Sequence, residues 1–150
     1  MQSLFLPVAV IVLDQITKGL VEKAVQNGVS IPVLGGLIHI SRVHNPGSSF
    51  GVLKTPTVPI AVTCLAVIAW VIVVLTGTDK RLGRTFQVGA GLIVGGALGN
   101  LIDRVRLGSV IDFIDFHIWP VFNVADTAVC VGAAILVYNL VMGNPGGRNN

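Results

Sequence analysis

The chain has 150 residues, enough for one domain, and 53% of them are apolar whereas only 11% are charged. Soluble domains carry about 25% charged residues, so this composition excludes an ordinary soluble domain, and the mean hydropathy of +0.82 agrees. The net charge of +3 comes from few residues, several of them beside apolar segments, which fits attraction to anionic lipid and argues against nucleic acid as a partner. The composition therefore predicts an integral membrane protein.

Four apolar segments predict four transmembrane helices and an all-α fold in one domain over residues 1–150. The segments are residues 4–24, 58–76, 86–103 and 124–142. Each has about 20 residues, which at ~1.5 Å per residue crosses a hydrocarbon core of ~30 Å. Because backbone groups in lipid must find hydrogen bonds within the segment, helices are expected there rather than strands.

The connector between the second and third segments sets the expected orientation. It covers residues 77–85 and carries three basic residues against one acid, so the positive-inside rule places it in the cytoplasm. Both termini are then also expected in the cytoplasm, and residues 25–57 and 104–123 are expected to face outward.

The first outward segment predicts a small strand or hairpin on the outer membrane surface, because apolar and polar residues partly alternate after Gly36. Further along, Gly47 to Gly51 match the G-x-S-x-G pattern that holds a nucleophilic serine in one class of hydrolases. That serine is Ser49, and His44 lies five residues before it, but no third group completes a triad. We therefore interpret the match as accidental, with Gly47 and Gly51 providing a tight turn.

The third apolar segment contains Gly91, Gly95 and Gly99 at four-residue spacing. Such a stripe of small residues lets another helix approach closely, so it predicts helix packing. Gly108, which follows this segment, can end the helix.

The sequence indicates no metal, cofactor or disulfide. Cys64 and Cys130 lie within apolar segments, where they are expected as small buried hydrophobic residues. His39, His44 and His117 have no metal-ligand spacing, which excludes a zinc peptidase of the H-E-x-x-H kind.

Ionisable residues at membrane depth are costly and are functional candidates for that reason. Asp112 lies before the fourth apolar segment and Asp126 near its start, and a reversal containing Pro120 separates them. The connector can therefore bring the two carboxylates together. Facing carboxylates share one proton, so one can take a proton from water while the other polarises a scissile carbonyl and donates to the leaving amine. This hypothesis requires neither a metal nor a covalent intermediate.

The acids near the fourth helix also have simpler interpretations. Asp126 can cap that helix, because acids favour the first turn. Asp112 and Asp115 are three residues apart and can be ordinary solvated surface acids.

The same holds for the charges of the first and third helices. Asp14 and Lys18 are spaced i, i+4 with the acid first, so they can neutralise each other within one helix. Asp103 can form an interfacial pair with its neighbour Arg104.

Four stretches of the sequence carry most of these polar residues. They are DQITK (residues 14–18), NPGSSFG (45–51), GGALGNLIDRVRLGSVIDFI (95–114) and FNVADTAVCVG (122–132). In this order they resemble the lipoprotein signal peptidases, a family also called signal peptidase II. The resemblance implies a four-helix aspartic endopeptidase of the bacterial cytoplasmic membrane, which removes the signal peptide of a prolipoprotein before a cysteine that carries diacylglycerol.

The resemblance also implies roles for individual residues. By position, Asp112 and Asp126 match the family's catalytic pair. The residues that match polar positions of the substrate pocket are Asn45, Asn100, Arg104 and Asn123. The residues that match further positions, expected mainly to support the site, are Asp14, Lys18, Asp103 and Gly47. The segment between the first two helices resembles the family's small extracytoplasmic β-cradle.

The expected partners follow from the same resemblance. They are diacylglyceryl-modified prolipoproteins, membrane lipid and inhibitors of the globomycin type, with no cofactor and no nucleic acid. The active site is expected on the extracytoplasmic side of the membrane, and the enzyme is expected to work as a monomer.

The sequence departs from the family's pattern in two places. The first loop differs from the family's usual sequence at Pro46, Ser48 and Ser49. These residues can change the stiffness or polarity of the cradle without affecting the aspartate pair. The connector over residues 113–122 is short, which limits its action as a lid over bound peptide.

Two other classes of function fit a small membrane protein with buried acids. A proton- or ion-coupled transporter would use the acids as a relay. Duplicated halves and broken helices would favour a transporter, and neither is evident in the sequence. A purely structural helix-bundle subunit would leave the clustered Asn, Asp and Arg residues unexplained.

Overall fold

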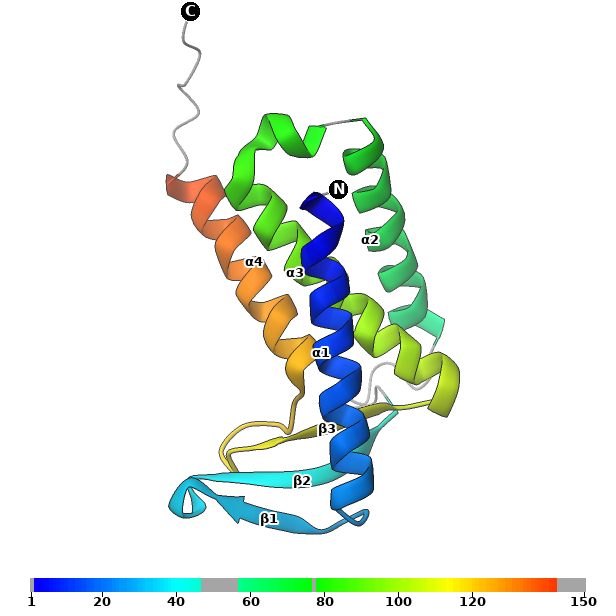
Figure 1. Cartoon of the computed structure of the whole chain (residues 1–150), viewed down its shortest axis with the longest axis vertical. Coiled ribbons are helices and arrows are strands. Elements are labelled where there is room, and N and C mark those ends of the chain that lie inside the picture. The colour runs from blue at the N-terminus through cyan, green and yellow to red at the C-terminus, as the bar shows by residue number, and fades with distance from the viewer. Residues whose placement is uncertain (1, 47–56, 77, 143–150) are drawn as a thin grey trace, which may run out of the picture.

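The computed structural model describes residues 2–46, 57–76 and 78–142. The helices in these ranges are α1 (Gln2–Ala24), α2 (Thr57–Leu75), α3 (Thr78–Leu107) and α4 (Val124–Met142). The strands are β1 (Ser30–Val33), β2 (Ile38–Asn45) and β3 (Val110–Asp115). The helices form a bundle, and the sheet crosses one end of it, away from the start of α1 and the end of α4 (Figure 1).

The helices have the length and composition of membrane spans. Three described stretches are long and apolar enough to cross a bilayer, namely Leu4–Ala24, Gly83–Leu107 and Val124–Met142. The described part of α2 adds a shorter apolar stretch, Thr63–Val74. Many large apolar side chains on these helices are exposed, as at Leu20, Ile68 and Leu140, which is the outer surface expected of helices that face lipid.

The third helix is longer than predicted, and the predicted cytoplasmic loop over residues 77–85 is largely helical. The helix begins at Thr78, and Gly83 interrupts it with φ 87° and ψ 174°. Lys and Arg are good helix formers, so the basic segment coils up to the glycine that redirects the chain. At its outer end α3 continues to Leu107, and Gly108, with φ 71°, closes it by donating its N–H to the carbonyl of Arg104 (3.1 Å).

The glycines of α3 pack against neighbouring helices, as the stripe predicted. A Cβ on Gly95 would lie 2.8 Å from Cβ of Val10 on α1. A Cβ on Gly96 would clash with the carbonyl oxygen of Ala125 in the first turn of α4. The glycines therefore set how closely the middle of α1 and the first turn of α4 approach α3.

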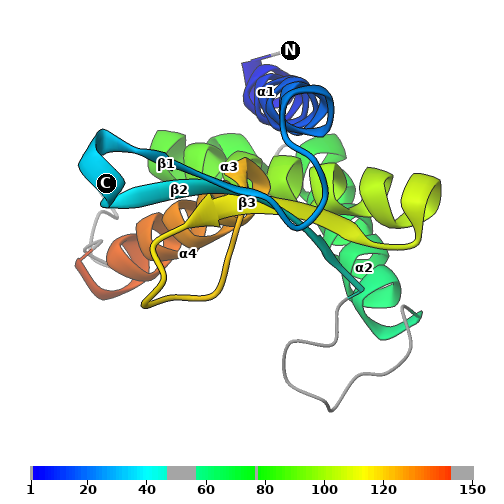
Figure 2. The same cartoon turned by 90° about the horizontal axis from the view of Figure 1, so that it is seen from below.

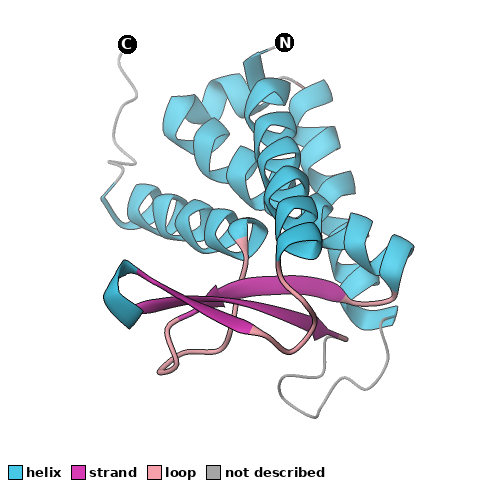
Figure 3. Cartoon of the chain, turned by 60° about the horizontal axis from the view of Figure 1, so that its bottom comes forward, coloured by secondary structure: helices cyan, strands magenta, loops and turns pink. Residues whose placement is uncertain are grey.

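The sheet is antiparallel in the order β1-β2-β3, and its third strand was not predicted. Strands β1 and β2 lie between α1 and α2, whereas β3 comes from the connector between α3 and α4. An apolar core holds the sheet against the end of α1, where Val21 and Val25 contact Phe113 of β3. Figures 2 and 3 show the sheet lying across the ends of the helices, with α1 on one side and α2 and α4 on the other.

The register of β2 and β3 decides which side chains share a face of the sheet. Val43 pairs with Asp112 and Asn45 pairs with Val110, and the register shifts between Ile40 and Val43. Side chains alternate between faces along a strand, so Asn45 lies on the same face as Asp112, while Asp115, three residues further along, lies on the other face.

Candidate active site

Asp112 lies in β3 with its side chain turned into the protein. The residue is only 3% exposed. Its carboxylate accepts a hydrogen bond from Nδ2 of Asn45 (2.9 Å) and another from Nδ2 of Asn123 (2.7 Å). Burial raises the pKa of Asp112 to about 6, and the negative charge of Asp126 adds to this, whereas the two amide hydrogen bonds act in the opposite direction.

Asp126 lies in the first turn of α4 and does cap this helix. Its Oδ2 accepts the backbone N–H of Asn123 (3.3 Å), and its own backbone N–H donates to Oδ1 of Asn123 (2.8 Å). This reciprocal pair is a capping box with Asn123 at the N-cap. The other carboxylate oxygen accepts Nδ2 of Asn100 (2.7 Å). Capping was an alternative to a role in the site, but the geometry lets one carboxylate do both.

Asn123 joins the two aspartates. Its side-chain amide donates to Asp112 while its backbone N–H donates to Asp126, so one residue contacts both carboxylates. Asn123 is fully buried and Asn100 nearly so. Both amides are therefore buried among the groups that hold the two carboxylates. Asn45, which is only half-buried, is the amide that can reach outward.

A buried charge cluster lies under the two aspartates. Nζ of Lys18 contacts Asp14 (2.8 Å), Asp103 (2.7 Å) and Oδ1 of Asn100 (3.0 Å). These are three acceptors for the three ammonium protons, so the cation is fully satisfied although it is only 2% exposed. Asp103 pairs with Lys18, so the predicted interfacial pair with Arg104 is wrong; neighbouring residues on a helix point in different directions.

The cluster positions the backbone next to each aspartate. Oδ1 of Asp14 accepts the N–H of Ala125 (3.0 Å), the residue before Asp126. Oδ2 of Asp103 accepts the N–H of Ile111 (3.2 Å), the residue before Asp112. The carboxylates of α1 and α3 therefore each hold one of the two segments that carry the site.

Gln15 completes the cluster, and the sequence assigned it no role. Its Nε2 lies within hydrogen-bond distance of Asp14 (3.2 Å) and Asp103 (2.9 Å), and its Oε1 accepts from Arg106 (3.2 Å). The only sequence signal was the place of Gln15 inside the DQITK stretch. Its hydrogen-bond partner on α3, Asp103, lies 88 positions away in the sequence, so the contact could not be anticipated.

The remaining predicted site residues are less closely tied to the aspartates. Arg104 lies on α3 with Nη1 3.5 Å from the carbonyl of Asn100, and its buried Nε has no partner among the described residues. Gly47 lies outside the described residues, as do Ser48 and Ser49 of the G-x-S-x-G match.

Asp115 lies on the opposite face of the sheet from Asp112. It accepts the backbone N–H of His117 (2.7 Å) and the hydroxyl of Ser41 (3.2 Å). The hydrogen bond from His117 lowers the pKa of Asp115, the reverse of the shift at Asp112. Asp115 is therefore a matched acid on the same strand that lies outside the site.

Two cavities flank the end of the connector. One of about 260 Å³ lies beside Asp112 and Asn45. The other, of about 320 Å³, lies beside Asp126, and its wall is otherwise almost entirely apolar. Pro120 and Val121 line both cavities, so this part of the connector lies beside both of them.

The cysteines are exposed, so the prediction that they are buried is wrong. Cys130 lines the cavity beside Asp126, and Cys64 lies on the surface of α2. In a membrane protein an apolar segment can turn a small hydrophobic side chain toward lipid as readily as toward the protein, so position in the segment does not decide burial.

The raised pKa of Asp112 predicts a pH-dependent effect of Asp112→Asn on stability. The folded value of about 6 lies above the ordinary value of 3.8, so between these limits the native state holds a proton that the unfolded state has lost. The contribution of Asp112 to the free energy of unfolding therefore falls as pH rises from about 4 to 6 and stays low above that. At pH 8 we expect the free energy of unfolding of Asp112→Asn to exceed that of the wild type by up to about 3 kcal/mol, so the variant should unfold at a higher temperature. Near pH 4 this difference should disappear.

Thermal unfolding in detergent at a series of pH values checks this expectation. Asp115→Asn is the control, and its difference from the wild type should not show this trend. A constant difference for Asp112→Asn between pH 4 and 8 would contradict the raised pKa.

The helices form a membrane-spanning bundle, and the sheet lies at one end of it. Beside the sheet two carboxylates accept hydrogen bonds from the same residue, Asn123. This is the arrangement of a membrane aspartic peptidase. Residues 6–142 match the family model described as signal peptidase (SPase) II. The chain belongs to the signal peptidase II family, which makes it an aspartic peptidase and excludes the transporter and the structural subunit.

Individual relatives agree with the family model. The lipoprotein signal peptidase of Moorella thermoacetica is 42% identical over 144 residues, covering 95% of this chain and 94% of that protein. The lipoprotein signal peptidase of Halothermothrix orenii is 43% identical over 131 residues, covering 87% and 89%. A solved structure described as a bacterial membrane enzyme has a TM-score of 0.86 and 30% identity, and the match covers 99% of this chain and 93% of that one.

Proposed function

We propose that this protein removes signal peptides from bacterial prolipoproteins, with Asp112 and Asp126 as the catalytic pair. The observation that carries the proposal is the bridge through Asn123, which holds the carboxylate of β3 and the carboxylate of α4 in one network. Burial, with a smaller contribution from the charge of Asp126, raises the pKa of Asp112, which supports Asp112 as the member of the pair that carries the proton.

The two carboxylates divide the work of hydrolysis. The ionised member takes a proton from a water molecule, which attacks the scissile carbonyl, while the protonated member donates a hydrogen bond to the carbonyl oxygen. The proton then passes to the leaving amine, and the pair returns to its singly protonated state. Asn45, whose amide both donates and accepts, is placed to hold the extended backbone of the substrate beside Asp112.

The pair acts at the extracytoplasmic surface of the cytoplasmic membrane. The start of α1 and the end of α4 lie at the end of the bundle away from the sheet (Figure 1), and the basic segment around Lys80 and Arg81 also begins α3 there. The positive-inside rule assigns that end to the cytoplasm, so the aspartates face outward. A substrate whose cysteine carries diacylglycerol is confined to the bilayer and meets the site by lateral diffusion.

Cleavage of a lipid-modified precursor by the purified protein tests the proposal. In detergent or liposomes, without added metal, the protein should release the signal peptide from a diacylglyceryl-modified precursor and leave the unmodified precursor intact. Globomycin should inhibit the reaction. A folded sample that cleaves neither precursor, or that cleaves both equally well, would contradict the proposed substrate.

A further inference from the structure

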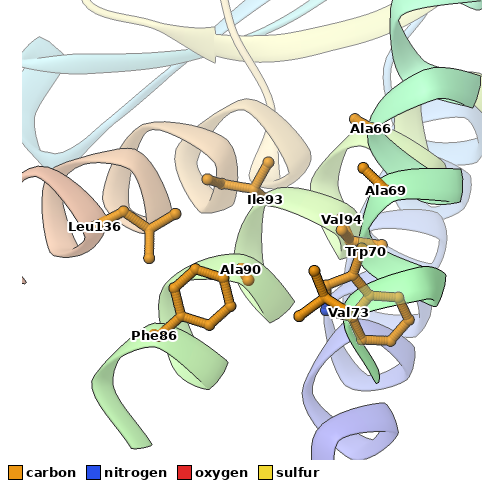
Figure 4. A pocket seen from close by; sticks show the side chains of 9 residues that line it. All are labelled: Ala66, Ala69, Trp70, Val73, Phe86, Ala90, Ile93, Val94 and Leu136. Atoms are coloured by element: carbon orange, nitrogen blue, oxygen red, sulfur yellow. The ribbon is translucent and has the colours of Figure 1, made fainter. Parts of the chain in front are cut away.

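An apolar groove lies between α2 and α4 on the surface of α3. Its volume is about 190 Å³, and its walls include Trp70 and Ala69 of α2, Ala90 and Phe86 of α3, and Leu136 of α4. Figure 4 shows the side chains of α2 on one side and Leu136 on the other, with Ala90 between them. In the described part of the chain α2 and α4 each pack on α3, with no extensive packing between them, so the groove opens to lipid.

The groove lies on the side of the bundle from which the aspartates can be reached through the membrane. On the other side α1 packs against both α3 and α4 and closes the bundle. The connector that lines both cavities at the aspartates lies on the same side of the sheet as α2 and α4 (Figure 2). A peptide that reaches Asp112 and Asp126 from within the bilayer therefore passes between α2 and α4.

The groove lies about ten helical residues from Asp126 along α4, toward the proposed cytoplasmic end of the bundle. Leu136 follows Asp126 by ten positions on α4, which corresponds to about 15 Å along the helix axis. An apolar helical segment of the substrate, with its cleaved bond at the aspartates, would place the residues about ten positions upstream beside Ala69 and Trp70.

We propose that this groove binds the apolar helix of the signal peptide, an inference that rests on the function proposed above. Lipid tails are as apolar as the groove, so close packing and not water exclusion must favour a helix there. Ala66, Ala69 and Ala90 supply the small side chains that let a helix approach closely, and Trp70 and Phe86 form the aromatic walls. The apolar helix upstream of the cleaved bond therefore contributes to substrate binding through its contacts with α2 and α3.

Filling the groove tests the proposal. In Ala69→Phe the new ring occupies the space, whereas Ile68→Phe adds an aromatic ring at the same depth on the exposed face of α2. Two lipid-modified precursors are compared, one with an apolar segment of full length and one shortened to end before the groove. For the full-length precursor we expect Ala69→Phe to raise KM about tenfold with kcat unchanged, and Ile68→Phe to have no effect. For the shortened precursor neither variant should differ from the wild type.

The shortened precursor also reports whether Ala69→Phe is folded and active. Equal cleavage of the full-length precursor by Ala69→Phe and the wild type would overturn the proposal, because filling the groove would then leave substrate binding unchanged. An equal loss on both precursors would overturn it too, because the effect would not depend on the upstream helix. If the wild type cleaved neither precursor, the proposed function itself would fail, a different result.

Disulfide trapping gives an independent reading. In a protein whose Cys64 and Cys130 have been replaced by alanine, Ala69→Cys should cross-link to a cysteine placed ten residues before the cleaved bond of the precursor. Ile68→Cys should not. Comparable cross-linking at both positions, or none at Ala69→Cys, would contradict the placement of the helix.

Discussion

Asp112→Asn and Asp126→Asn are each expected to lower the rate of precursor cleavage by about 10³-fold or more, whereas Asp115→Asn is expected to keep a rate close to that of the wild type. An amide can neither take a proton from water nor donate one to the leaving amine, so either change stops the shared-proton cycle. Asp115 is a carboxylate on the same strand, but it lies on the opposite face of the sheet and bonds to His117 and Ser41 instead. The measurement is the initial rate on a diacylglyceryl-modified precursor.

Controls for this experiment separate chemistry from folding. Each variant must elute as the wild type does in detergent and bind a globomycin-type inhibitor or unfold cooperatively. Ser49→Ala belongs in the same series, because Ser49 is the serine of the G-x-S-x-G match. Loss of cleavage in Ser49→Ala together with normal cleavage in Asp126→Asn would refute the aspartate mechanism and restore the serine as nucleophile.

Lys18→Met is expected to destabilise the protein by about 3–5 kcal/mol and to abolish cleavage, although Lys18 contacts neither Asp112 nor Asp126, the proposed catalytic pair. The change removes the cation between Asp14 and Asp103, both essentially unexposed, and leaves two uncompensated carboxylates in the interior. Those carboxylates hold the N–H groups of Ala125 and Ile111, so the segments that carry the proposed catalytic pair should lose their positions.

Lys23→Met is the matched control, because Lys23 is an exposed lysine of the same helix. Thermal unfolding in detergent and precursor cleavage should leave it close to the wild type. The triple change Lys18→Met, Asp14→Asn, Asp103→Asn removes the charges together and should regain much of the lost stability, because no carboxylate is then left unpaired. Normal stability of Lys18→Met would show that the buried charges are not coupled as the structure indicates.

Much of the helical fold could be predicted from the sequence, because long apolar segments leave few alternatives in lipid. The third strand could not. Val110–Asp115 is a short stretch that is mostly apolar and buried, and such a run does not show the alternation by which a half-buried strand is recognised. The start of α3 was also missed, since a basic segment reads as a cytoplasmic loop whether or not it is helical.

The residues of the candidate site could be predicted from the sequence, but the hydrogen bonds between them could not. The two aspartates, and the idea that the connector brings them together, came from the residues, and their match to a catalytic pair came from the resemblance. Sequence could not tell that Asn123 and Asn100 donate hydrogen bonds to the carboxylates, because an amide side chain in the sequence does not reveal its partner. It also treated capping and catalysis at Asp126 as alternatives, although only one of the two carboxylate oxygens caps the helix.

The capping box joins the local order of α4 to the proposed catalytic role of Asp126. Asp126 keeps its position through hydrogen bonds with Asn123, and those bonds exist only while the first turn of α4 is wound. If this turn opens, the helix loses its cap and the enzyme loses its aspartate pair in the same event. Activity should then disappear with the fraying of a single turn at the membrane surface, well before the bundle separates, and amide hydrogen exchange at Asp126 should report the population of inactive molecules under native conditions.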